Sequence, residues 1–353
     1  MRTLLAGLIS LALGLVAAFA GVLHRAPTPW LPRPGPGPVG LWVADRAGGV
    51  IHGLDQDLFP VRALEVPCPV AVVGAGSGRL WVASALQDTR WGHHALALLN
   101  VAGQPIAGLP TGTVQSLHAS HAGGVFVHHL DRDQGRAVLD HVGVHGLRTH
   151  VDHAEWFDAM ASRGSQLLAA TQDGWLTAYD LEHGSVPACE GAVPGPVSAI
   201  VAQPNCDDWW VAWRAPPRAG DRKWRGRLSR VTLVRGAQLE ISETLRMPFL
   251  VRALLVSGPH LWALELDGAR AQRIQVGTPG PHPIARLLDG PPVGAVALAG
   301  PEAGCIVFTA EALLALDGDT TCRTTQGMFQ SISSVTSCTV DSTTLDPSPW
   351  SGP

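Results

Sequence analysis

Short apolar segments recur along most of the chain, and Gly-rich or polar turns separate them. Many of these segments open with one four-residue pattern: Val or Phe, any residue, a small residue, then an aliphatic residue or Met. The copies are Val114–Leu117, Phe157–Met160, Val197–Ile200, Val251–Leu254, Val293–Val296 and Phe329–Ile332, with a looser first copy at Val70–Val73. Their starts differ by 44, 43, 40, 54, 42 and 36 residues. Such a period, built from strands and turns, is typical of β-propeller blades.

Each copy except the last is followed, after a turn, by a second apolar strand, and the two strands together predict a hairpin. The second strands are Leu80–Ala83, Val125–Val127, Leu167–Ala170, Trp209–Ala212, Leu261–Leu264 and Cys305–Phe308. A third strand follows in most repeats, as at Ala95–Leu99, Trp175–Tyr179 and Leu313–Leu316. The segment before the next copy supplies a fourth, so each repeat predicts one four-stranded blade.

The two ends of the repeat region complement each other. Leu41–Ala44 is a second strand with no first strand before it, and Phe329–Val340 is a first strand with no second strand after it. We therefore expect the last strand to pair beside Leu41–Asp45, which closes the ring and protects the sheet edges. The predicted fold is an all-β, seven-bladed propeller over residues 39–340, with an open β-solenoid or two sandwiches as the alternatives.

The amino terminus predicts export. Arg2 precedes an apolar run from Leu4 to Leu23, which has the charge and length of a targeting segment. Ala18–Ala20 fits a cleavage site, yet about 20 apolar residues also suffice for a spanning helix. Residues 1–25 are thus a signal peptide or a membrane anchor, residues 26–38 a Pro-rich linker, and residues 341–353 a polar tail. Either interpretation places the propeller outside the cytoplasm, in the periplasm or at the cell surface.

Composition narrows the function classes. Only 15% of residues are charged and the net charge is −4, which argues against intrinsic disorder and against a nucleic-acid partner. The six cysteines include no CxxC pair, which argues against zinc-ribbon, thioredoxin-like and c-type haem sites. In an exported chain they allow up to three disulfides, whose pairing stays open, or free thiols. They are Cys68, Cys189, Cys206, Cys305, Cys322 and Cys338.

Two stretches resemble known propeller repeats. Val70–Ser84, and Gly258–Glu265 followed by Gln272–Val276, resemble blades of the bacterial YVTN, NHL and virginiamycin B lyase-like propellers. Ala178–Gly184 resembles the repeat of quinoprotein (PQQ-like) propellers, although Ala188 stands where that repeat has a docking Trp. The resemblance implies blades over residues 39–340 and no particular reaction, because the lyase's histidines and magnesium-binding carboxylate do not map onto this chain.

Long links between strands locate the binding face. In a propeller the second-to-third-strand links and the links between blades share one face, here called the top face. Ten of the 15 histidines fall between His93 and His153, many of them predicted on this face. With nearby carboxylates they could bind a divalent metal, or they are ordinary surface residues. The candidate metal ligands are His128, His129, His150 and His153.

The link Trp213–Arg227 is rich in Arg and Trp, the residues that dominate binding hot spots. It predicts a site for a protein partner or a small anionic ligand, unless it is a plain exposed insertion or contacts lipid headgroups. Trp42, Trp81, Trp210 and Trp262 repeat at one strand position and are interpreted as packing residues. The candidate binding residues are Trp91, Trp156, Trp213, Arg214, Arg218, Arg222, Trp224 and Arg225.

Motifs for nucleophilic catalysis are missing from the sequence, since there is no GxSxG elbow and no Cys with an assigned His partner. The sequence therefore favours an exported, non-catalytic binding or scaffolding module that acts through its top face. The alternative is a metal-assisted lyase or hydrolase that uses His and acidic residues at the mouth of the channel.

Overall fold

The computed structural model describes residues 39–337 with short gaps. The gaps are 56, 77, 89–93, 101, 110–111, 132–134, 147, 153–155, 182–186, 205, 218–222, 235–237, 269, 276–283, 287–291, 298–304, 310–311, 318–319, 327–328 and 330. The predicted leader 1–25, linker 26–38 and tail 341–353 lie outside the described residues. Within the described part, no helix is long and apolar enough to cross a membrane.

The described residues form 28 strands in six sheets, and within each four-stranded set neighbouring strands are antiparallel. The first three sheets along the chain are β28–β1–β2–β3 (Ile332–Ser337, Leu41–Asp45, Val50–Leu54, Pro60–Glu65), β4–β5–β6–β7 (Pro69–Gly74, Leu80–Asp88, His94–Leu99, Pro105–Leu109) and β8–β9–β10–β11 (Thr113–Ala119, Val125–Asp131, Arg136–Val142, Arg148–Asp152).

The remaining strands form one eight-stranded sheet and two four-stranded sheets. The eight-stranded sheet joins β12–β13–β14–β15 (Phe157–Arg163, Gln166–Thr171, Trp175–Asp180, Pro187–Ala192) to β16–β17–β18–β19 (Val197–Ala202, Asp208–Ala215, Arg225–Val234, Gln238–Arg246). The other two are β20–β21–β22–β23 (Val251–Ser257, His260–Glu265, Arg270–Gln275, Ile284–Arg286) and β24–β25–β26–β27 (Gly294–Ala297, Cys305–Phe308, Ala312–Asp317, Thr320–Gln326).

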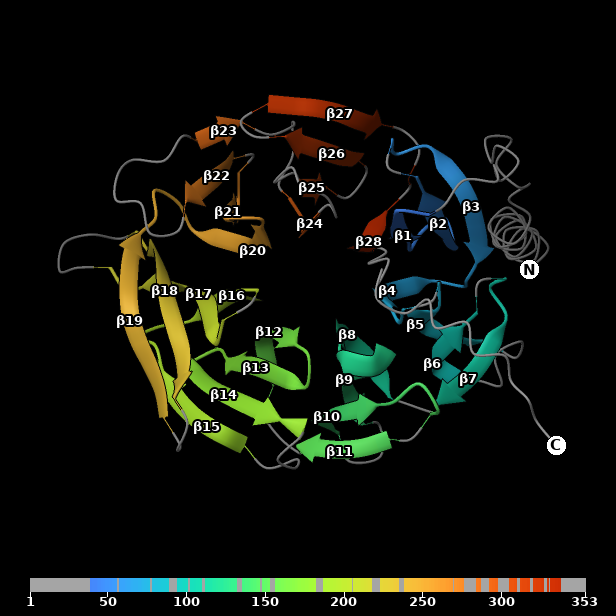
Figure 1. The fold of residues 1–353 in the computed structure, drawn as a ribbon, viewed down its shortest axis with the longest axis horizontal. Coiled ribbons are helices and arrows are strands. Elements are labelled where there is room, and N and C mark those ends of the chain that lie inside the picture. The colour runs from blue at the N-terminus through green and yellow to red at the C-terminus, as the bar shows by residue number, and fades with distance from the viewer. Residues whose placement is uncertain are drawn as a thin grey trace, which may run out of the picture.

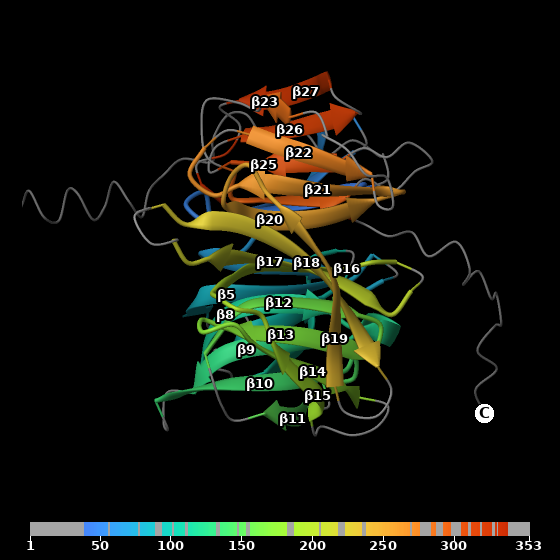
Figure 2. The same cartoon turned by 90° about the vertical axis from the view of Figure 1, so that its left-hand side faces the viewer.

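The sheets stand in a ring around a central axis, here called the channel axis (Figure 1). The first strand of each set, here called the inner strand, lies nearest the centre: β28, β4, β8, β12, β16, β20 and β24. At the periphery, β15 and β19 join through a parallel pairing at Glu190 and Gln238, which makes the eight-stranded sheet. In the side view the long strands β18 and β19 run along the outside of the ring (Figure 2).

The predicted closure of the ring is confirmed. β28 pairs antiparallel with β1 along its length, so a strand from the end of the chain completes the first sheet. Side-chain hydroxyls on β28 also bond the backbone of β4 in the next sheet: the Ser333 hydroxyl lies 2.8 Å from the carbonyl oxygen of Pro69, and the Val72 N–H donates to Ser334 Oγ at 3.3 Å. The closing strand thus links two sheets.

The second strands of the sheets form the core, because they are covered on both faces. All five residues of β1 and all four of β25 are buried. The four Trp residues at the repeated strand position are at most 2% exposed, which confirms them as packing residues. They are Trp42, Trp81, Trp210 and Trp262, and Trp81 Nε1 donates to the Gly123 carbonyl oxygen at 2.9 Å.

Most inner strands carry a β-bulge at the same position of the repeat. The position of the bulge corrects the first residue of two predicted repeats. The pairing with the second strand skips one residue between Val114 and Ser116 in β8, and likewise in β12, β16 and β20. In β4 it skips Val70, so the pattern begins at Pro69 rather than at Val70. In β28 it skips Ser333, so the pattern is Ile332–Val335 and not Phe329–Ile332.

Free thiols account for four of the six cysteines. Cys68, Cys189, Cys206 and Cys305 make no disulfide, and burial raises the pKa of Cys305 to about 12. A thiol held protonated in this way is a weak nucleophile. Cys305 therefore adds no reactive group to the sites described below.

Candidate functional site

The bulges place a set of polar side chains at one end of the channel. A bulge leaves one residue unpaired and re-aims its side chain, and bulges are over-represented beside functional sites. The skipped residues of four consecutive inner strands are Gln115, Asp158, Ser198 and Arg252. All four line one cavity of about 390 Å³. It lies towards the amino-terminal ends of β12, β16 and β20, which is the predicted top face.

The rest of the cavity wall is mostly apolar. Phe157, Met160, Ile200 and Leu254 line it from three inner strands. Trp156, half-exposed in the link before β12, stands at the rim. A cavity of this size with an apolar wall and a few convergent polar groups has the general character of a small-molecule site.

Trp156 also borders a second, open hollow on the outer side of the rim, together with Thr171, Gln172 and Asp173 from the turn after β13. The turn depends on Gly174, whose φ of +95° and close approach to the Val193 carbonyl oxygen leave no room for a side chain. The Thr171 hydroxyl donates to Asp173, and this bond lowers the pKa of that carboxyl. Asp173 is therefore an ionised group beside the rim.

The two charged groups in the cavity are not paired. No hydrogen bond or ion pair joins Asp158 or Arg252 to any other described residue. Burial raises the pKa of Asp158, and no neighbouring positive charge offsets that effect. β16, with Ser198, lies between the strands that carry the two charges. The cavity is therefore lined by one carboxylate and one guanidinium, both exposed, that pair with no other described residue.

Two histidines in the same wall are neutral at pH 7. Burial, and to a smaller extent the neighbouring His129, lowers the pKa of His128 to about 4. Burial and the nearby His128 lower the pKa of His118 to about 4 as well. His128 is 2% exposed, its ring centroid lies 5.6 Å from that of Trp156, and its Nε2 atom has no hydrogen-bond partner. The cavity thus contains neutral imidazoles rather than additional cations.

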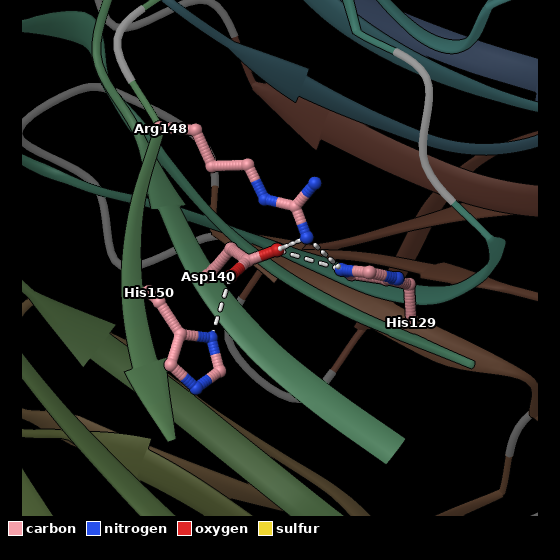
Figure 3. A network of polar contacts seen from close by, with 4 residues as sticks. All are labelled: His129, Asp140, Arg148 and His150. Atoms are coloured by element: carbon pink, nitrogen blue, oxygen red, sulfur yellow. Dashed lines mark hydrogen bonds and ion pairs between the residues drawn. The ribbon is translucent and has the colours of Figure 1, made fainter. Parts of the chain in front are cut away.

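Two of the predicted metal ligands gather around a buried carboxylate in the sheet β8–β11 (Figure 3). Asp140, 1% exposed, lies 2.7 Å from His129 Nε2, 2.5 Å from Arg148 and 3.1 Å from His150 Nδ1. Burial alone would raise the pKa of Asp140, but hydrogen bonds from His129, Arg148 and His150 hold it below its usual value. A guanidinium occupies the position beside the carboxylate, so the group ties three adjacent strands together.

The other predicted ligands do not join this group. His128 and His129 are consecutive in β9, and consecutive side chains of a strand point to opposite faces of its sheet. His128 contacts Phe157 of the following sheet, whereas His129 contacts Asp140. His153 lies outside the described residues. In the described ranges, no group of three or more His, Cys, Asp or Glu side chains could hold a metal ion, and the metal site stays a prediction.

The predicted Trp and Arg residues are dispersed. Trp213 is 8% exposed inside a hydrophobic cluster, and its indole N–H donates to Ser229 Oγ at 2.9 Å, so it packs in the core. Trp224 is exposed, Arg214 is half-buried, and Arg225 begins β18. Trp91, Arg218 and Arg222 lie outside the described residues. Of this candidate set, the described residue that reaches the cavity is Trp156.

Sequence reasoning missed the polar groups of the cavity, although the repeat contained the signal. The second position of the four-residue pattern accepts any residue, and it becomes the bulged position in the structure. In four consecutive copies this position holds Gln115, Asp158, Ser198 and Arg252. A run of polar residues at a variable inner-strand position could have identified the site.

Comparisons with known proteins identify the fold. Neither a protein family model nor a curated protein matches the chain. Among solved structures, hydrazine synthase from Kuenenia stuttgartiensis is similar at 10% identity and a TM-score of 0.60, over 79% of this chain and 92% of that one. The β-propeller domain of Myceliophteria thermophila Cps50 (Swd1) is similar at 11% identity and a TM-score of 0.54, over 79% and 93%. This chain is a β-propeller.

A third similar structure, the dihydro-heme d1 dehydrogenase NirN, matches this propeller at 13% identity and a TM-score of 0.58, over 86% of this chain and 67% of that one. Identities this low show the shared fold alone, because one fold carries many functions. The function of this propeller therefore has to be argued from its own cavity.

Proposed function

We propose that this protein is an exported, seven-bladed propeller that acts as a non-catalytic binding module through the cavity at the top of its channel. The blade count takes the eight-stranded sheet as two blades, β12–β15 and β16–β19, joined at their outer strands. The apolar run behind Arg2 supports export. A rigid ring of sheets with a cavity on its axis suits binding, because the walls are fixed before the ligand arrives.

The observation that carries this proposal is the cavity lined by the bulged residues of β8, β12, β16 and β20. Bulges that merely ended the strands could have carried small or apolar side chains, as Val70 in β4 shows. Here four consecutive bulges direct polar groups into one space. Two of those groups, Asp158 and Arg252, are charged and have no partner among the described residues. Both side chains are exposed in the free protein, so a ligand can pair with them without first breaking an ion pair to a described residue.

A cavity-blocked variant tests the proposal. Ser198→Trp puts a large side chain at the bulge in the middle of the cavity wall. We would screen a library of small polar compounds by ligand-observed NMR against the wild type and this variant. The proposal expects compounds that bind the wild type and lose binding to Ser198→Trp at an unchanged melting temperature. If every bound compound binds both proteins equally, the cavity is not the binding site.

A metal-assisted lyase or hydrolase is the second candidate, and one observation favours it. His118 and His128 are neutral, as metal-binding imidazoles must be, and they line the same cavity as Asp158. These three side chains do not form a metal-binding group as they stand, so a metal would have to draw them together. Zinc or nickel content after dialysis distinguishes the candidates. A retained equivalent of metal that is lost in His118→Ala would favour the enzyme, and protein without bound metal that still binds ligands would favour the binding module.

A further inference from the structure

The charges of the cavity define what kind of molecule would fit it. Arg252 supplies one positive charge, which stays fixed because a guanidinium does not deprotonate in proteins. Asp158 supplies one negative charge at neutral pH. The remaining polar groups in the wall, Gln115, Ser116, Ser198 and the two histidines, are neutral at that pH. The site therefore offers one cationic and one anionic contact and no excess of either.

The protein keeps these two charges apart. They lie on β20 and β12, which are separated by β16, and each reaches the cavity from its own bulge. An Arg and an Asp that served stability alone would be expected to meet, as Arg230 and Asp208 do within β17 and β18. Charges held on two inner strands with a third between them can instead both contact one molecule in the cavity.

The space between the charges limits the size and the polarity of that molecule. A volume of about 390 Å³ is near the lower end of small-molecule sites. Met160, Ile200 and Leu254 line the wall deeper along the same strands, so an apolar group would lie against them. A ligand with two opposite charges and a short apolar side chain satisfies all of these features together.

We propose that the cavity binds a small zwitterion of the α-amino acid type, with its carboxylate paired to Arg252 and its ammonium group paired to Asp158. Arg forks bind carboxylates through two parallel hydrogen bonds, which fixes the orientation of the ligand. The indole of Trp156 stands at the rim, where it would cover the bound molecule from the solvent. This inference rests on the proposed binding function and specifies its ligand.

Removing one charge of the ligand at a time tests this pairing. The probes are L-leucine, L-methionine and L-phenylalanine, each compared with its amide, which lacks the carboxylate, and with its N-acetyl form, which lacks the ammonium group. Isothermal titration calorimetry measures the affinities. Because a hydrogen bond to a charged group is lost in each analogue, at least one free amino acid should bind about 10- to 100-fold more tightly than both of its analogues.

Variants of the protein assign each charge to its partner. The Arg252→Gln variant should bind the amide as tightly as the free amino acid. The Asp158→Asn variant should bind the N-acetyl form as tightly as the free amino acid. Matched controls are Arg136→Gln and Asp267→Asn, which change exposed residues that do not line the cavity and should preserve both differences. A role of Arg252 or Asp158 in folding alone would not change the preference among analogues.

Two results would overturn the inference, and they differ in what they say about the proposed function. If the library screen finds ligands that Ser198→Trp abolishes, but the amides or N-acetyl forms bind as tightly as the free amino acids, the zwitterion is wrong and the binding module stands. If neither the amino acids nor any library compound depends on the cavity, both proposals fail.

Discussion

The two sides of the channel use the same structural device for different purposes. On the side of β28 and β4, the bulged residues are Ser333 and Val70, and the Ser333 hydroxyl contacts the carbonyl oxygens of Pro69 and Ala44. On the side of β12, β16 and β20, the bulged residues are Asp158, Ser198 and Arg252, and they line a cavity. The side of β28 and β4 closes the ring, whereas the side of β12, β16 and β20 lines a cavity.

The difference shows how a repeat can carry a ligand-binding site while its fold is unchanged. The buried second strands and the small third residue of the pattern are needed in every sheet, because they make the core. The bulged residue does not have to pack in the core, because the bulge leaves it unpaired and re-aims its side chain. Hydroxyls at this position bind the neighbouring backbone and stabilise the closure, and charged groups at the same position create a surface for a ligand.

Removal of the closing strand should have the largest effect. A chain that ends after Met328 lacks β28, which leaves the edge of β1 unpaired and exposes the inner face of β4. We expect loss of the cooperative thermal transition, measured by circular dichroism and calorimetry. The control ends after Val340, lacks only the polar tail, and should melt like the full chain. A truncated chain that still unfolds cooperatively would show that the seam is not required.

Acid should weaken the cavity side before the seam. The pKa values of His118 and His128 are lowered to about 4 in the folded protein, below the ordinary value of 6.5. Both groups stay neutral when folded and bind protons when unfolded, so stability present above pH 6.5 is lost as the pH falls towards 4. The seam hydroxyls do not titrate in this range, but burial also lowers the pKa of His52 beside the seam. Because the cavity side has two such histidines and the seam has one, the cavity side should lose more stability.

Hydrogen exchange at pH 7 and pH 4.5 measures this difference region by region. Amides of β8, β9 and β12 should lose protection in acid more than amides of β28 and β1. His118→Gln should make the decline of the unfolding free energy between pH 6.5 and 4 shallower. Equal loss of protection on both sides of the channel would contradict the comparison.

Serine at the bulge offers a smaller, matched test. Ser333→Ala removes a hydroxyl that contacts two carbonyl oxygens, at 2.8 and 3.2 Å, and should cost about 1 kcal/mol. Ser198→Ala removes the equivalent hydroxyl on the cavity side, which has only a 3.4 Å contact with the Ala212 carbonyl oxygen, and should cost less than about 0.5 kcal/mol. Urea unfolding measures both values. Equal losses of unfolding free energy would mean that the two hydroxyls contribute equally to stability, which would contradict the comparison.

The unpaired charges should contribute least to stability. Asp158→Asn and Arg252→Gln break no bond to a described residue, and each should stay within about 0.5 kcal/mol of the wild type. The same variants are expected to change ligand preference strongly. A large loss of stability in either variant, by the same urea measurement, would show that the charge has a structural role instead.

The sequence pattern predicted the strands well because buried second strands need continuous apolar runs. The pattern misplaced the last repeat because Phe329 satisfies it. In the structure Phe329 lies before β28 and packs edge-on against His52, with the ring centroids 5.3 Å apart. The metal prediction counted histidines along the chain, whereas alternation in β9 sends His128 and His129 to opposite faces. The cavity was missed because the variable position of the repeat carries its polar groups.

We expect the bulged residues of the cavity to bind a small charged ligand. The direct test is a crystal structure of the protein with the tightest-binding amino acid. It should show one molecule in the cavity, with its carboxylate at Arg252 and its ammonium group at Asp158. A molecule bound elsewhere on the protein, with the cavity empty at a concentration that saturates binding in solution, would contradict it.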